Sequence, residues 1–241
     1  MKKKLVLFDI DGTLVTSTSH GVRYWKQRVR HVIKEAYGAE VNFEIDVHRY
    51  NGGVDKQVLR SIAHDAGVSD QDFESKFLRA CEVFHEELKE SIHRGDIQYS
   101  AVATAIELVK LLHTKNQHFY GLITGNIEIN GWLKLTTAGI REYFTFGAFA
   151  DEVGDRAELA RNAVSKAKTH FNYQFASSDI VIIGDTVHDI ICGKHVGAIT
   201  IGVTTGLSSD YKALTDEGAD LVVDSLMDKR VLELLGLEQD K

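Results

Sequence analysis

The sequence predicts an α/β protein in which helices cover a parallel sheet, with a group of helices inserted after the first strand. Over residues 96–241, short apolar runs alternate with segments of helical periodicity, and this alternation is typical of a parallel sheet with helices on both faces. Over residues 16–95 the periodicity is helical, and no strand signal of comparable strength interrupts it. We therefore expect an α/β domain formed by residues 1–15 and 96–241 and a small helical domain formed by residues 16–95.

The composition is that of an ordinary globular protein, and it limits the classes of partner. Of the 241 residues, 44% are hydrophobic and 26% are charged. The formal net charge of −7 argues against a nucleic-acid partner. The apolar stretch behind the N-terminal lysines ends at Asp9, which makes it too short for a signal peptide or a membrane span. With two cysteines, Cys81 and Cys192, we expect a cytoplasmic protein without disulfides or a cysteine-based zinc site.

The first expected strand, residues 5–8, leads directly into two acidic residues, Asp9 and Asp11, and an expected turn at Gly12. In an open α/β sheet the chemistry lies beyond the carboxyl ends of the strands. Paired carboxylates at that place suit divalent-metal binding, nucleophilic attack or proton transfer. The same two acids also occur as ordinary strand-end residues in an Asp-Gly turn, so the pair alone leaves both interpretations open.

The insert is expected to contain three helices. Residues 20–37 and 54–66 have helical periodicity and are each followed by a glycine. Ser69 is in position to cap a third helix that reaches about Ile92. Between the first two helices lies a loop of mainly polar residues with two glycines, which either enters a site or only connects the helices. Its candidate contact residues are Tyr50, Asn51, Gly52, Gly53, Asp55 and Lys56.

Behind the insert, the expected elements alternate between helix and strand. Ser100 is expected to cap a helix that ends near Lys115. The strands that follow are expected at 118–123, 144–149, 180–183, 198–203 and 221–223. The intervening helices are expected at 129–138, 155–170, 187–196, 210–217 and 226–235.

Three further groups of polar residues follow expected strands. Thr124, Gly125 and Asn126 combine a hydroxyl, a close-approaching backbone and an amide, which suits phosphate binding but also an ordinary helix cap. Arg156 stands in the first turn of a helix, where a cation is unfavourable for the helix dipole, so we expect it to serve another purpose. Asp185 and Asp189 are four residues apart and can share one helix face, although either acid also suits a helix N-terminus.

Taken in order, four motifs resemble those of the haloacid dehalogenase-like hydrolase superfamily. They are Asp9-Ile10-Asp11-Gly12-Thr13, Thr124-Gly125-Asn126, the cation Arg156 at a helix start, and Gly184-Asp185 with Asp189. The helical insert resembles the cap of the phosphoglycolate phosphatase-like and β-phosphoglucomutase-like branch. The resemblance implies a Rossmann-like core with a helical cap, and a Mg²⁺-dependent phosphatase of a small phosphate monoester.

The resemblance also implies a role for each matching residue. Asp9 would attack phosphorus to form an aspartyl-phosphate, and Asp11 would act as general acid and base. Mg²⁺ would be held by the Asp9 carboxylate, the Asp11 backbone carbonyl and Asp185, with Asp189 supporting it indirectly or through water. The phosphoryl group would be bound by Gly12, Thr124, Gly125, Asn126 and Arg156, and the insert loop of residues 50–56 would select the substrate.

Several alternatives remain open at this point. A dehalogenase or a phosphonatase of this superfamily lacks the second acid, so Asp11 argues against both. A phosphomutase shares all four motifs, and a phosphorylated-ligand sensor with slow turnover could keep the fold. The expected partner is a small phosphorylated metabolite, with no nucleic acid and no membrane, and the protein is expected to be a monomer or a homodimer.

Overall fold

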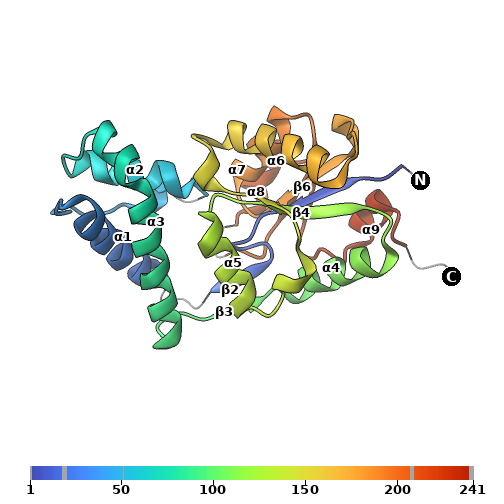
Figure 1. Cartoon of the computed structure of the whole chain (residues 1–241). Helices are drawn as coiled ribbons and strands as arrows, with labels where there is room; N and C mark the ends of the chain where they lie inside the picture. Colours follow the sequence, from blue (N-terminus) through green and yellow to red (C-terminus); the bar gives the residue numbers. More distant parts are fainter. Residues whose placement is uncertain (1, 18–20, 51, 207–208, 239–241) are drawn as a thin grey trace.

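The computed structural model describes residues 2–17, 21–50, 52–206 and 209–238, and its centre is a six-stranded sheet (Figure 1). The strand order is β5-β4-β1-β6-β7-β8, and every neighbouring pair is parallel. The expected parallel sheet is therefore confirmed. The strands are β1 (Leu5–Phe8), β4 (Phe119–Ile123), β5 (Gly147–Ala148), β6 (Ile180–Gly184), β7 (Ile199–Val203) and β8 (Leu221–Val223).

Helices cover both faces of this sheet, because its strands are apolar on both sides. Leu5 and Leu7 belong to the hydrophobic cluster that includes helix α6, whereas Val6 and Phe8 belong to the cluster that includes α4 and α9. Figure 1 shows α6 and α7 on one side of the sheet and α4 and α9 on the other. The helices are α4 (Ala103–Lys115), α5 (Glu128–Thr137), α6 (Arg156–Phe171), α7 (Val187–His195), α8 (Tyr211–Asp216) and α9 (Lys229–Leu235).

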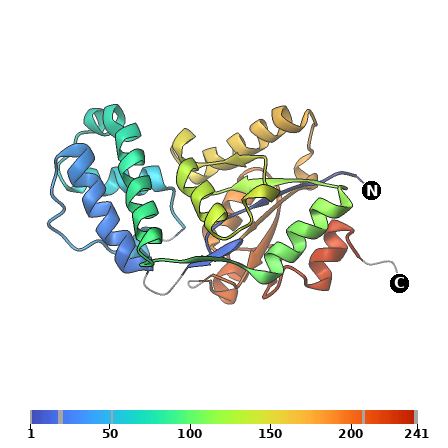
Figure 2. The same ribbon diagram turned by 60° about the horizontal axis from the view of Figure 1, so that its bottom comes forward.

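The insert forms a group of helices beside the carboxyl ends of the strands (Figures 1 and 2). It consists of α1 (Gly21–Tyr37), a 3₁₀ turn (Val47–Tyr50), α2 (Asp55–Asp65) and α3 (Asp70–His93). As expected, Ser69 caps α3, and its hydroxyl accepts a hydrogen bond from the Asp72 amide at 3.1 Å. Tyr37 of α1 stacks on Phe73 of α3 with ring centroids 5.4 Å apart, so aromatic packing joins the two longest helices of the insert.

The connections to the insert differ from the expectation, since they form a small sheet of their own. Strand β2 (Val15–Ser17) pairs antiparallel with β3 (Tyr99–Ala101), and Ser100 lies opposite Thr16. The expectation that Ser100 caps a helix is therefore wrong. Its backbone pairs with the other connection, and α4 begins only at Ala103, behind Val102. Pairing between residues far apart in sequence leaves no local signal, which is why the periodicity did not indicate these strands.

Other boundaries shift by a few residues. The strand expected at 144–149 is reduced to Gly147–Ala148, which follows a 3₁₀ turn. The last helix begins at Lys229 instead of 226, because the Asp228 carboxylate caps it by accepting the Arg230 amide. The remaining 3₁₀ turns are Arg141–Tyr143, Ala150–Glu152 and Ser177–Asp179. Within the described ranges, every helix is too short or too polar to cross a bilayer.

Candidate functional site

A cavity of about 330 Å³ lies where the insert meets the carboxyl ends of β1, β4 and β6. The residues that directly follow these strands, Asp9, Thr124 and Asp185, all line it. Because the carboxyl ends of parallel strands share one edge of the sheet, they bring together groups that are far apart in sequence. The insert contributes residues of α1 and of the loop before α2 to the opposite wall.

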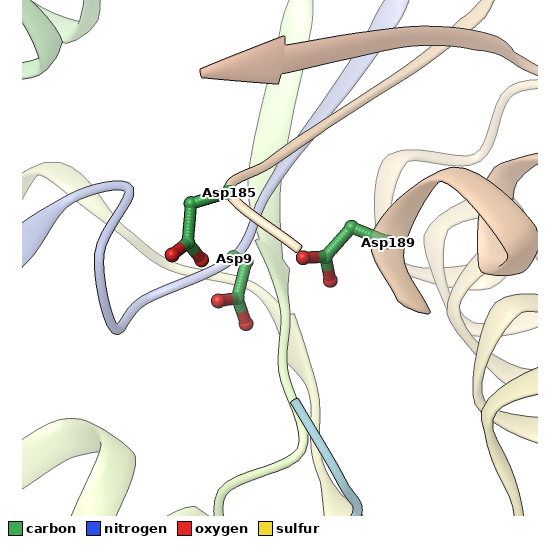
Figure 3. Close-up of side chains that lie close together, drawn as sticks. All are labelled: Asp9, Asp185 and Asp189. Carbon is green, nitrogen blue, oxygen red and sulfur yellow. The ribbon is translucent and has the colours of Figure 1, made fainter. Parts of the chain in front are cut away.

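Three buried carboxylates form a cluster beside this cavity (Figure 3). Asp9 follows β1, and its amide donates to the Ile183 carbonyl of β6 at 2.9 Å. Asp185 follows β6, and Asp189 lies in the first turn of α7. One carboxylate oxygen from each acid lies within 4.8 Å of the others. The sequence-predicted acids Asp9, Asp185 and Asp189 are thus brought together.

The carboxylates of this cluster repel one another because they are buried close together. Burial raises the pKa of Asp9 well above its ordinary value, and the neighbouring acids Asp189 and Asp185 raise it further. Burial and Asp189 likewise raise the pKa of Asp185 to about 8. A divalent cation bound between the carboxylates would relieve this repulsion. Oxygen ligands without Cys or His suit Mg²⁺ better than zinc, so the residues fit the expected metal.

Arg156 connects this cluster to the insert. Its Nη1 donates to Asp189 Oδ1 at 2.9 Å, while Nε and Nη2 donate to the Gly52 carbonyl at 2.9 and 2.5 Å. The Asp155 side chain caps α6 and so fixes the turn that carries Arg156. Asp189 itself closes the N-terminus of α7, since its Oδ2 accepts from the Thr186 amide and hydroxyl. Arg156 therefore pairs with the Asp189 carboxylate of the core and with the Gly52 carbonyl of the insert.

Asp11 also lines the cavity and has two partners of its own. Its Oδ2 accepts from Asn126 Nδ2 at 2.8 Å and from Lys134 Nζ at 2.6 Å. Lys134 also reaches Asn126 Oδ1 at 2.5 Å. Burial alone would lower the pKa of Lys134, but the nearby Asp11 outweighs it and the pKa is raised. This lysine of α5 is therefore a fixed positive charge beside Asp11.

The expected phosphate-binding segment after β4 lines the cavity as three consecutive residues. Thr124 is completely buried, and its hydroxyl accepts from Asn126 Nδ2 at 2.7 Å. Asn126 thus holds the side chains of both Thr124 and Asp11. A side chain at Gly125 would collide with the Gly53 carbonyl of the insert, so glycine is needed for the two loops to approach one another.

The insert loop contacts the core through its backbone and one carboxylate. The Asp55 amide donates to the Gly125 carbonyl at 2.7 Å, and Asp55 Oδ2 accepts from the Ile127 amide at 3.1 Å. Burial raises the pKa of Asp55 to about 6. Tyr50, Gly52 and Gly53 also line the cavity, whereas Asn51 lies outside the described residues.

Two expectations for individual residues differ from the structure. Lys56 does not line the cavity; its Nζ is 3.2 Å from a Glu74 carboxylate and lies over the Phe77 ring. Gly12 lines the cavity and adopts a φ of +79°, but its amide already donates to the Val15 carbonyl at 2.8 Å. That amide is therefore used by the turn.

The sequence did not single out three groups at this site. Lys134 follows a helical pattern that does not distinguish a buried lysine from an exposed one. Ser209, which donates to Asp185 at 3.1 Å, arrives from a distant loop. Arg28 lines the cavity from α1. It lies three residues after Trp25 and four before Val32, so a cation on an apolar helix face was the available signal.

Comparison with known proteins agrees with this arrangement. Residues 6–203 match the family model described as haloacid dehalogenase-like hydrolase. A phosphoglycolate phosphatase of Vibrio parahaemolyticus is 26% identical over 233 residues, covering 92% of each chain. A pyrophosphatase PpaX of Anoxybacillus flavithermus is 26% identical over 239 residues, covering 98% of this chain and 99% of the relative. The structure of a β-phosphoglucomutase from Clostridium difficile superposes with a TM-score of 0.69 at 18% identity and covers 98% of each chain, which shows a shared fold.

Proposed function

The chain belongs to the haloacid dehalogenase-like hydrolases, and on that basis we propose that it is a Mg²⁺-dependent phosphatase of small phosphate monoesters. The observation that carries the proposal is the convergence of Asp9, Asp11, Thr124, Arg156 and Asp185 on one cavity. The names of the relatives, a phosphoglycolate phosphatase and a pyrophosphatase, support the same reaction class. The cavity volume of about 330 Å³ suits a small metabolite.

In the first step, an Asp9 carboxylate oxygen attacks phosphorus. A bond from phosphorus to Asp9 forms, and the bond from phosphorus to the ester oxygen breaks. Asp11 gives its proton to the departing alcohol. In the second step, Asp11 takes a proton from water, the water oxygen attacks phosphorus, and the bond to Asp9 breaks. Phosphate leaves, and both aspartates return to their starting states.

The surrounding side chains position these two aspartates and the phosphoryl group. Thr124 and Arg156 supply the hydroxyl and the positive charge that face phosphoryl oxygens. Asn126 and Lys134, which both hydrogen-bond Asp11 Oδ2, keep its carboxylate at the cavity wall and limit its rotation. Orientation by such contacts accelerates a reaction because the entropy of alignment has been lost before the chemical step.

Asp9, Asp185 and the Asp11 backbone carbonyl would hold Mg²⁺, with Asp189 supporting the site indirectly or through water. When bound, Mg²⁺ supplies positive charge that offsets the negative charge of the phosphoryl oxygens during transfer. The raised pKa values of Asp9 and Asp185 support this assignment, because uncompensated buried carboxylates favour a cation.

We assign residues 16–95 as a cap domain that covers the site. Contacts of Asp55 with the Gly125 carbonyl and the Ile127 amide, and of Arg156 with the Gly52 carbonyl, support this assignment. Closure would exclude water from the leaving group, and opening would release the product. A cytoplasmic location fits Cys81 and Cys192, which form no disulfide with one another.

The proposal is tested by measuring phosphate release from a panel of sugar phosphates, phosphorylated acids and nucleotides, with Mg²⁺ and with EDTA. We expect turnover of at least one ester that stops on chelation and in Asp9→Asn. Transfer of the phosphoryl group to a second sugar phosphate, without release, would identify a phosphomutase instead. Tight binding of an ester without turnover by the Mg²⁺-loaded protein would identify a sensor.

A further inference from the structure

Arg28 is a cation buried beside the cavity. It lies on α1 of the insert and is 5% exposed. Its Nε and Nη1 atoms are buried and have no hydrogen-bond partner among the described residues. Arg28 nevertheless lines the same cavity as Asp9 and Thr124.

The other two cations that line the described part of the cavity each have hydrogen-bond partners within the protein. Arg156 is bonded to Asp189 and the Gly52 carbonyl, and Lys134 is bonded to Asp11 and Asn126. Both therefore belong to the network that organises the reacting groups. Arg28 is left as the positive charge that the enzyme's own residues do not neutralise within the described part of the cavity.

The acids near Arg28 do not explain its burial. Asp55, Glu87 and Asp11 are near enough to attract it electrostatically, but among the described residues none makes an ion pair with it. Each of the three has another partner: Asp55 accepts from the Ile127 amide, Glu87 pairs with His31 at 3.2 Å, and Asp11 pairs with Lys134. A buried guanidinium without a hydrogen-bonded partner is costly for folding, and an anionic ligand would offset this cost.

We propose that Arg28 binds a second anionic group of the substrate, either a carboxylate or a second phosphate. The inference rests on the proposed phosphatase reaction. A phosphoryl group at Asp9 occupies the strand ends, and the rest of the molecule extends into a cavity whose opposite wall carries α1. A planar guanidinium recognises both carboxylate and phosphate by paired hydrogen bonds. The substrate class is therefore small phosphate compounds that carry a further negative charge.

Two matched pairs of compounds test this selection. Phosphoglycolate is compared with 2-hydroxyethyl phosphate, which replaces the carboxylate by a hydroxymethyl group. Propane-1,3-diol bisphosphate is compared with 3-hydroxypropyl phosphate, so the two pairs distinguish a carboxylate from a second phosphate. For at least one pair, we expect the wild-type kcat/KM to favour the charged member by about 10- to 100-fold, the range of a charge-assisted hydrogen bond.

In Arg28→Met this preference should fall towards one, mainly through a higher KM for the charged member. Arg28→Lys should restore part of it, since a point charge lacks the planar fork. Arg23→Met is the matched control, because it removes the same charge from an exposed position of the same helix. Equal preference in the wild type, or an unchanged preference in Arg28→Met, would overturn the inference.

Stability and binding separate this inference from the proposed reaction. Replacing an unpaired buried cation by Met should leave the Tm of the free protein unchanged or raise it. A lower Tm together with unchanged selectivity would assign Arg28 a structural role. Calorimetric titration with 3-phosphonopropionate, propane-1,3-bisphosphonate and propylphosphonate, none of which is hydrolysed, measures the same preference without turnover. If the wild type favours either doubly anionic compound over propylphosphonate only while Arg28 is present, the inference stands even if no ester is hydrolysed. If it binds all three equally or none of them, the inference fails.

Discussion

Replacing Asp185 by Asn should stabilise the metal-free protein at alkaline pH. In the folded protein, burial and Asp189 raise the pKa of Asp185 from 3.8 to about 8. Between these two pH values the folded state holds a proton that the unfolded chain has released, so stability is lost as pH rises through this window. At about 1.36 kcal/mol per pH unit, the full difference corresponds to roughly 6 kcal/mol as an upper limit. Because Asn cannot ionise, the variant does not lose this part of its folding stability as pH rises.

The assay is urea unfolding in EDTA at pH 4.5 and pH 8.5. We expect the free energy of unfolding of Asp185→Asn, minus that of the wild type, to be at least about 2 kcal/mol larger at pH 8.5 than at pH 4.5. This is less than the upper limit because movement of the carboxylates will relieve part of their repulsion. Glu107→Gln, an exposed acid on α4, is the control. Saturating Mg²⁺ should reverse the order by stabilising the wild type more than the variant. A pH-independent difference would show that Asp185 does not hold this extra proton in the folded state, and equal stabilisation of both proteins by Mg²⁺ would show that Asp185 does not bind the metal.

Three further substitutions test how the cavity is organised. Arg156→Ala should lower kcat/KM by about 100- to 1,000-fold, and Arg156→Lys should recover part of that loss; steady-state kinetics that match the wild type would exclude phosphoryl binding by this residue. Lys134→Met should slow the hydrolysis of alkyl phosphates by about 10- to 100-fold, because it disturbs Asp11, which protonates the leaving oxygen. The hydrolysis of aryl phosphates with good leaving groups should slow less, and an equal loss of rate for both would point to general disruption of the site. Asp55→Ala removes the carboxylate that accepts a hydrogen bond from the Ile127 amide, so it should raise KM and leave the Mg²⁺ requirement unchanged. The control Gln57→Ala, at an exposed position, should leave KM unchanged. An unchanged KM in both variants would show that the Asp55 contact does not contribute to cap closure.

Much of the fold could be predicted because its signals are local. The apolar run before Asp9 and the run before Asp185 each encode a buried strand, and parallel topology then places both acids at one edge of the sheet. This is why acids separated by most of the chain could be assigned to one site. The short strands at Val15–Ser17 and Tyr99–Ala101 were missed, because each is defined only by pairing with the other.

The partners of the site residues were harder to predict, because they also depend on contacts between residues far apart in the sequence. A lysine in an amphipathic helix normally reaches solvent, and nothing next to Lys134 in the sequence shows that it bonds to Asp11. Lys56 shows the converse, since it is next to the insert loop in sequence but pairs with Glu74 on α3. Side-chain direction depends on how helices pack, and sequence spacing alone does not give that packing.

Covalent phosphorylation of Asp9 during turnover is the most direct test of the proposed mechanism. The protein is mixed with an accepted ester and Mg²⁺, quenched in acid within the first turnover, and digested for mass spectrometry. We expect a phosphate group on the peptide that contains Asp9, its disappearance when turnover is complete, and its absence in Asp9→Asn. Phosphate on a peptide without Asp9, or full activity of purified Asp9→Asn, would show that Asp9 is not the nucleophile.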